Sequence, residues 1–131
     1  MMDTLLERVV PADFSSVGAL RNATDAFLQE PAEDQFRATL LLVVSELCAN
    51  AVEALSDSSA KFTLRVHDTP ESFAVEVCDA GPGFASALTK PGASGSDPRG
   101  RGLQIVRSLV DELHVRRRRG LTTVRCVIRK H

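Results

Sequence analysis

The sequence lacks the features that mark several large classes of protein. Its three cysteines, Cys48, Cys78 and Cys126, lie in apolar stretches without CxxC spacing, so we expect reduced thiols and neither a metal site nor a disulfide. No apolar run approaches the roughly 20 residues of a membrane span, and the N-terminus lacks the basic-then-apolar order of a signal peptide. The net charge of −1 argues against direct nucleic-acid binding. We therefore expect a cytoplasmic protein without membrane contact.

The chain also has no low-complexity tract and no internal repeat. Its 131 residues predict a single domain over residues 1–131. A domain of this size buries roughly 68–70% of its unfolded surface, which is enough for a real core without disulfides or metals.

Thr39 to Leu55 predicts a central helix, because its residues favour helix and neither proline nor glycine interrupts it. Most of this stretch is apolar, as expected for a helix packed on a sheet. Glu46 and Asn50 nevertheless lie one turn apart on one line of the helix. Burying a carboxylate and a carboxamide is costly unless a partner pairs with them. The line is therefore either a solvated stripe or a metal-and-phosphate site.

Periodicity and turn residues predict the remaining elements. They are an edge strand over Thr4 to Val10, a helix over Phe14 to Gln29 capped by Asp13 or Ser15, the long helix capped by Asp34, strands over Phe62 to His67 and Phe73 to Cys78, a helix over Leu103 to Leu113, and a hairpin of His114 to Arg119 and Leu121 to Arg129. Three helices on one side of a mixed, mostly antiparallel sheet form a two-layer α+β sandwich.

An acid at the end of the second central strand is unusual. Period two places Asp79 on the apolar face of that strand, and Gly81 and Gly83 follow at once. Glycine allows another molecule to approach the backbone closely, although this pattern is also typical of a tight loop. Ala85 to Arg99 shows no periodicity and is typical of a lid, in which Lys90 and Arg99 are candidate phosphate contacts.

Gly100-Arg101-Gly102-Leu103 then opens a helix, where free backbone N–H groups suit phosphate oxygens. Glycine before a helix is common, so this signal is weak alone. The stretch is not a P-loop, because no Gly-Lys-Ser/Thr follows, and it lacks the third glycine of a dinucleotide fingerprint.

The order of these motifs resembles the GHKL ATP-binding fold of histidine kinases, gyrase, Hsp90 and bacterial anti-sigma-factor serine kinases. The motifs are Glu46-x-x-x-Asn50, Asp79-x-Gly81-x-Gly83, Gly100-x-Gly102-Leu103 and Thr122 in the last strand. The resemblance covers nearly the whole chain and is greatest to the anti-sigma kinase branch. It rests there on Val10 to Asp13 opening into a helix that bears Arg21, the phrase Ser45 to Val52, and the closing Thr122-Thr123-Val124.

The resemblance implies an ATP- and Mg²⁺-dependent protein-serine kinase. Asn50 would ligate Mg²⁺, and Glu46 would be the general base that takes the proton from a serine hydroxyl. The other implied contacts are to the nucleotide: Asp79 to the adenine amino group with support from Thr122, Gly81 and Gly83 beside the adenine, and Gly100, Arg101, Gly102 and Leu103 around the phosphates.

The implied partners are a sigma factor, which the protein would sequester, and an anti-anti-sigma antagonist, which it would phosphorylate on serine; a homodimer is compatible with this. Arg21 would contact a partner, although without the resemblance it is an ordinary surface charge.

One alternative is a nucleotide-gated binding module without kinase activity, against which Glu46 argues. Another is the catalytic domain of a histidine kinase, against which the lack of a preceding His-bearing or dimerisation helix argues.

Two positions depart from the family pattern. Leu121 stands where the family often has glycine before the first threonine, and Ala54 stands where it often has a histidine four residues after the asparagine. The first departure concerns the implied role of Thr122, and the second concerns the residues near the nucleotide pocket. The basic run Arg116 to Arg119 is interpreted as the solvated tip of the closing hairpin.

Overall fold

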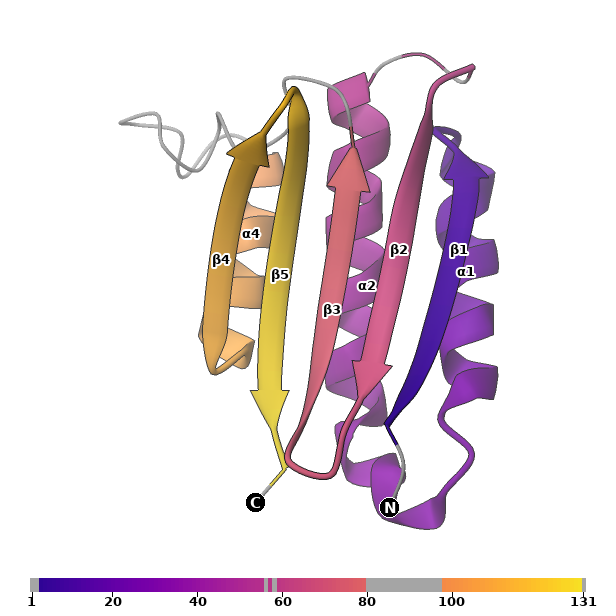
Figure 1. Ribbon diagram of the computed structural model, residues 1–131, viewed down its shortest axis with the longest axis vertical. Coiled ribbons are helices and arrows are strands. Elements are labelled where there is room, and N and C mark those ends of the chain that lie inside the picture. The colour runs from indigo at the N-terminus through magenta and orange to yellow at the C-terminus, as the bar shows by residue number, and fades with distance from the viewer. Residues whose placement is uncertain (1–2, 56, 58, 80–97, 131) are drawn as a thin grey trace.

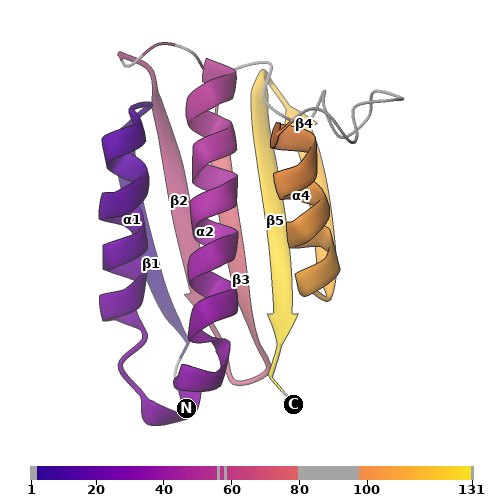
Figure 2. The same ribbon diagram turned by 180° about the vertical axis from the view of Figure 1, so that it is seen from behind.

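A computed structural model describes residues 3–55, 57, 59–79 and 98–130, which form a five-stranded sheet with helices on one face (Figures 1 and 2). Its elements, in chain order, are β1 Thr4–Pro11, α1 Phe14–Phe27, the short 3-10 helix η1 Pro31–Glu33, α2 Asp34–Leu55, β2 Lys61–Asp68, β3 Ser72–Asp79, α4 Pro98–Leu109, β4 Glu112–Arg118 and β5 Leu121–Arg129.

The strand order is β1-β2-β3-β5-β4, so β1 lies at an edge as predicted. Each neighbouring pair is antiparallel, which makes the sheet of the described residues wholly antiparallel instead of mixed. The two-layer α+β sandwich is confirmed, with α1, α2 and α4 on one face (Figure 2).

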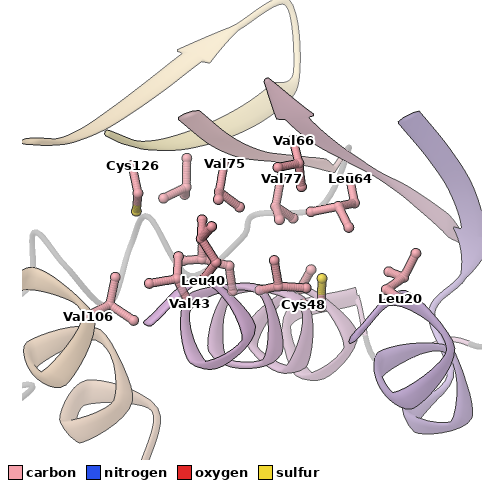
Figure 3. Close-up of a cluster of buried hydrophobic side chains, with 14 of the residues drawn as sticks. Leu20, Leu40, Val43, Cys48, Leu64, Val66, Val75, Val77, Val106 and Cys126 are labelled. Carbon is pink, nitrogen blue, oxygen red and sulfur yellow. The ribbon is translucent and has the colours of Figure 1, made fainter. Parts of the chain in front are cut away.

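The core lies between this helix layer and the sheet (Figure 3). Alternate residues of β2 and β3 point into it, because side chains along a strand alternate between the two faces. Those buried there include Leu64, Val66, Val75 and Val77. The opposite face is polar: the Glu76 carboxylate accepts a hydrogen bond from His67 Nε2 at 2.8 Å, and Glu7 pairs with Arg65.

Of the two helix caps that the sequence predicted, the first is confirmed and the second is wrong. Asp13 caps α1, where its Oδ1 accepts a hydrogen bond from the Ser15 N–H at 2.9 Å. Asp34 is not the predicted cap of α2, because η1 precedes that helix directly. Instead, the Glu30 N–H donates to Glu33 Oε1 at 3.0 Å, and the Asp34 carboxylate accepts from Arg37.

The last helix, α4, begins at Pro98 and ends at Leu109, so it starts and stops several residues before the predicted Leu103 to Leu113. Proline is compatible with a first helical turn, since the N–H groups there have no intrahelical acceptor. Leu113 belongs to β4, where it pairs with Cys126 and packs against the core as a strand residue.

One segment, Pro31–Leu55, is long and apolar enough to cross a membrane by length and composition alone, a test that the buried core helix of a folded domain also passes. In this fold α2 is the central core helix, and Leu40, Val43, Val44 and Leu47 are fully buried within it.

The three thiols differ in accessibility, which gives a direct test of the core. Burial raises the pKa of Cys48 and of Cys126 to about 12, whereas Cys78 is partly exposed on the open face of the sheet. Thiolate is the reactive form. We therefore expect one thiol to react quickly with Ellman's reagent at pH 8 in the folded protein, and all three in guanidinium. Cys78→Ser should abolish the fast reaction; a fast phase that survives it would contradict this core.

Candidate functional site

The buried carboxamide of Asn50 is the centre of the site. Asn50 lies in the C-terminal half of α2 and is 3% exposed. Within the part of the chain that the structure describes, its Nδ2 makes no hydrogen bond. A buried polar group without a partner typically costs about 1–3 kcal/mol. A half-turn of the carboxamide exchanges nitrogen and oxygen, so this position can offer either a donor or an acceptor to a ligand.

Glu46 lies one turn before Asn50 on the same helix, as the spacing predicted. Its side chain is only half-buried, and it makes no hydrogen bond or ion pair within the described ranges. The predicted polar line is thus neither a solvated stripe nor a buried one. It is buried at Asn50 and reaches solvent at Glu46, which lets a carboxylate meet an outside molecule beside a buried amide.

Asp79 and Thr122 form the second part of the site, on the sheet. Asp79 ends β3 and is 2% exposed, so the predicted inward acid is confirmed as buried. It pairs in register with Phe62 on one side and with Thr122, which is fully buried, on the other. The Oδ2 atom of Asp79 accepts no hydrogen bond from the described chain, although the residue makes a further interaction.

These parts meet at one end of the molecule, the upper end in Figure 1. There β3 ends, β5 and α4 begin, and the C-terminal end of α2 lies behind them. The arrangement places Asn50 and Glu46 on the helix layer, with Asp79 and Thr122 on the sheet beneath it. Gly81 and Gly83 of the predicted site lie outside the described residues, as do the predicted lid residues up to 97.

The predicted phosphate-binding residues lie within α4 and not ahead of it. Gly100 belongs to the first turn, where N–H groups lack intrahelical acceptors, and Arg101 and Gly102 follow it. Leu103 lies past that turn, and its side chain is 2% exposed in the core. Gly100 is therefore the best placed of the four to offer a backbone N–H to an anion.

Arg21 lies away from this cluster, exposed on α1. It borders a shallow hollow of about 510 Å³ between α1 and α2, together with Arg37, Leu41, Leu42 and other α2 residues. The predicted partner contact therefore lies on a different part of the molecule from Asn50 and Asp79.

Sequence reasoning missed one polar residue of the site. Arg117 of β4 donates a hydrogen bond from Nη1 to Thr122 Oγ1 at 3.1 Å. The sequence held a signal for this contact, the turn at Arg119-Gly120. In the structure both turn residues have positive φ, and a two-residue turn here pairs Arg118 with Leu121 and Arg117 with Thr122. Arg117 is thus not part of a uniformly solvated tip.

The side chains available as ligands limit which metal ion this site can bind. Among the described residues there is no group of three or more His, Cys, Asp or Glu side chains able to enclose an ion. Mg²⁺ typically takes one or two protein oxygens and completes its shell with phosphates and water. An amide oxygen of Asn50 fits that pattern, with a nucleotide supplying the remaining ligands.

A buried acid at the end of a strand and a buried amide on the helix layer above the sheet thus form a candidate ligand site in an α+β sandwich. Comparison with known proteins agrees: the chain belongs to the histidine kinase-like ATPase domain family, whose sequence model matches residues 10–128. No curated protein sequence matches it.

The fold is also similar to the crystal structure of the RsbU and RsbW domains of Rv1364c from Mycobacterium tuberculosis. The TM-score is 0.66 at 18% sequence identity, over 96% of this chain. The chain spans 32% of the length of that protein chain. At this identity the similarity shows the shared fold.

Proposed function

We propose that this protein is an ATP- and Mg²⁺-dependent protein-serine kinase that also sequesters a sigma factor. The observation that carries the proposal is the pairing on α2 of a buried carboxamide, Asn50, with a half-exposed carboxylate, Glu46, one turn away. Membership of a histidine kinase-like ATPase family supports nucleotide binding at this place. A domain that only bound nucleotide would not need the carboxylate.

In this proposal each residue has one task. Asn50 contributes an oxygen to Mg²⁺, Asp79 accepts a hydrogen bond from the adenine amino group, and Thr122 supports it from the next strand. The bound nucleotide supplies the phosphoryl group. Glu46 accepts the proton that leaves the serine hydroxyl, so that the hydroxyl oxygen can bond to phosphorus as the bond to the departing ADP breaks.

The remaining nucleotide contacts complete the proposal. Gly81 and Gly83 let the adenine lie close to the backbone, and the stretch Gly100 to Leu103 wraps the phosphates. Gly100, in the first turn of α4, is the member whose backbone position favours this most directly.

The protein substrate is proposed to be an anti-anti-sigma antagonist, phosphorylated on serine in a cytoplasmic partner-switching system that regulates transcription. Support comes from the resemblance to anti-sigma kinases and from the fold shared with a chain that contains an RsbW domain. Arg21, exposed beside the hollow between α1 and α2, is the proposed partner contact. A homodimer is compatible with this arrangement.

The test is phosphoryl transfer from radiolabelled ATP to co-encoded candidate partners, followed by identification of the labelled chain and amino acid. We expect label on serine of a small antagonist protein, dependent on Mg²⁺. If ATP binds but no partner is ever labelled, the protein is a nucleotide-gated binding module. Label on histidine would instead support the histidine kinase alternative.

A further inference from the structure

A single row of side chains crosses the sheet at the candidate nucleotide site. In register, Phe62 pairs with Asp79, Asp79 with Thr122, and Thr122 with Arg117, across β2, β3, β5 and β4. Directly paired residues of antiparallel strands project to the same face. Because Asp79 and Thr122 are buried beneath the helices, Arg117 also projects from β4 toward the helix side.

The hydrogen bond between Arg117 and Thr122 restricts what the threonine hydroxyl can do. A guanidinium group only donates, so its bond to Oγ1 at 3.1 Å occupies an acceptor site of that oxygen. The hydroxyl has one hydrogen of its own, and it donates that hydrogen to no acceptor within the described ranges. The positively charged guanidinium repels the hydroxyl hydrogen, so that hydrogen is directed away from β4, toward the β3 side of Thr122 where Asp79 lies.

We propose that Arg117 is a positioning residue that selects adenine by holding Thr122 as a hydrogen-bond donor. This inference rests on the proposed function, in which Asp79 and Thr122 face the base. Adenine presents an amino donor beside the ring acceptor N1, whereas guanine presents an oxygen acceptor beside an N1–H donor. An acceptor at Asp79 next to a donor at Thr122 matches adenine. Without Arg117 the hydroxyl can turn and accept from guanine.

The neighbouring arginine provides a matched control. Arg116 pairs with Thr123 on the opposite face of the same two strands, just as Arg117 pairs with Thr122. Both arginines are exposed and carry the same charge. Arg116→Leu therefore removes an equal charge from the hairpin without touching the row that contains Asp79.

The experiment is calorimetric titration of ATP, GTP and 1-deaza-ATP, an analogue that lacks the N1 acceptor, into wild type and variants. We expect Arg117→Leu to weaken ATP about fivefold, the usual worth of one hydrogen bond, and to leave 1-deaza-ATP unchanged. GTP affinity should not fall, because the hydroxyl is then free to accept from the guanine N1–H. Arg116→Leu should change none of the three, and Arg117→Lys, which keeps a donor, should restore part of the loss.

A double-mutant cycle with Thr122→Val separates positioning from a general charge effect. Once the hydroxyl is gone, Arg117→Leu should cause no further loss of ATP affinity. Equal losses for ATP and 1-deaza-ATP, a loss that persists in Thr122→Val, or a loss matched by Arg116→Leu would each overturn the inference. Should Arg117→Leu lower the melting temperature relative to Arg116→Leu, the unbranched Arg117→Met, which likewise has no N–H donor, is used with the same expectations.

The two proposals fail differently. If the wild-type protein binds no ATP, the proposed function is wrong and this inference with it. If the wild type binds ATP and Asp79→Asn weakens that binding, but Arg117→Leu has no effect, only the role of Arg117 is wrong.

Discussion

Replacing Glu46 with alanine is expected to lower phosphoryl transfer by roughly 10²–10⁴-fold, the usual contribution of a general base, while ATP binding is largely retained. The half-buried carboxylate lies on α2 one turn from Asn50, where it can reach an incoming hydroxyl without holding the nucleotide itself. Transfer to the antagonist protein is measured at saturating ATP, so that any change in affinity does not enter the rate. Removing this negative charge could even tighten ATP binding.

Two variants of the same helix serve as controls for Glu46. Asn50→Ala should lose Mg²⁺-dependent nucleotide binding as well as transfer, because its carboxamide is proposed to hold the metal. Glu53→Ala removes an exposed carboxylate two turns along α2 and should leave transfer unchanged. A Glu46→Ala protein that phosphorylates as fast as wild type would show that Glu46 is not the base.

The second large effect is expected at Asp79. Asp79→Asn should weaken ATP by about 10–150-fold, since a lost hydrogen bond to a charged group typically costs about 1.5–3 kcal/mol. Asparagine keeps the size of the buried side chain, which is 2% exposed, so packing against Thr122 and Phe62 is preserved. GTP should weaken less, because its base has no amino group at the position that Asp79 is proposed to read.

The losses of ATP affinity and of GTP affinity are both measured by calorimetry on the same Asp79→Asn protein, so a general defect of the variant would lower both equally. A melting temperature measured without nucleotide establishes that the variant is folded. Unchanged ATP affinity in a folded Asp79→Asn protein would rule out Asp79 as the adenine acceptor.

Local periodicity was enough to predict the faces of the sheet and the polar line on α2. Phe62, Leu64 and Val66 are buried as the period of two requires, and the inward direction of Asp79 followed from the same rule. Glu46 and Asn50 share a line because the helix repeats every 3.6 residues. Such inferences succeed because the period depends on backbone geometry alone.

Boundaries depended on tertiary context. Pro98 is compatible both with a loop and with the first turn of a helix. In the structure it begins α4, and Leu103 and Val106 of this helix are buried in the core. The apolar residue Leu113 fits a helix by spacing, but pairing with Cys126 makes it part of β4.

The sequence by itself determined the order of the site motifs and the residue types that a nucleotide site requires. Only the tertiary structure decided that Asn50 is buried while Glu46 reaches solvent, because neighbours distant in the chain cover one part of the line and not the other. It likewise decided that Arg117 contacts Thr122 whereas the other arginines of the hairpin do not. Strand register turns adjacent residues to opposite faces, and the surrounding sheet determines which face contains the site.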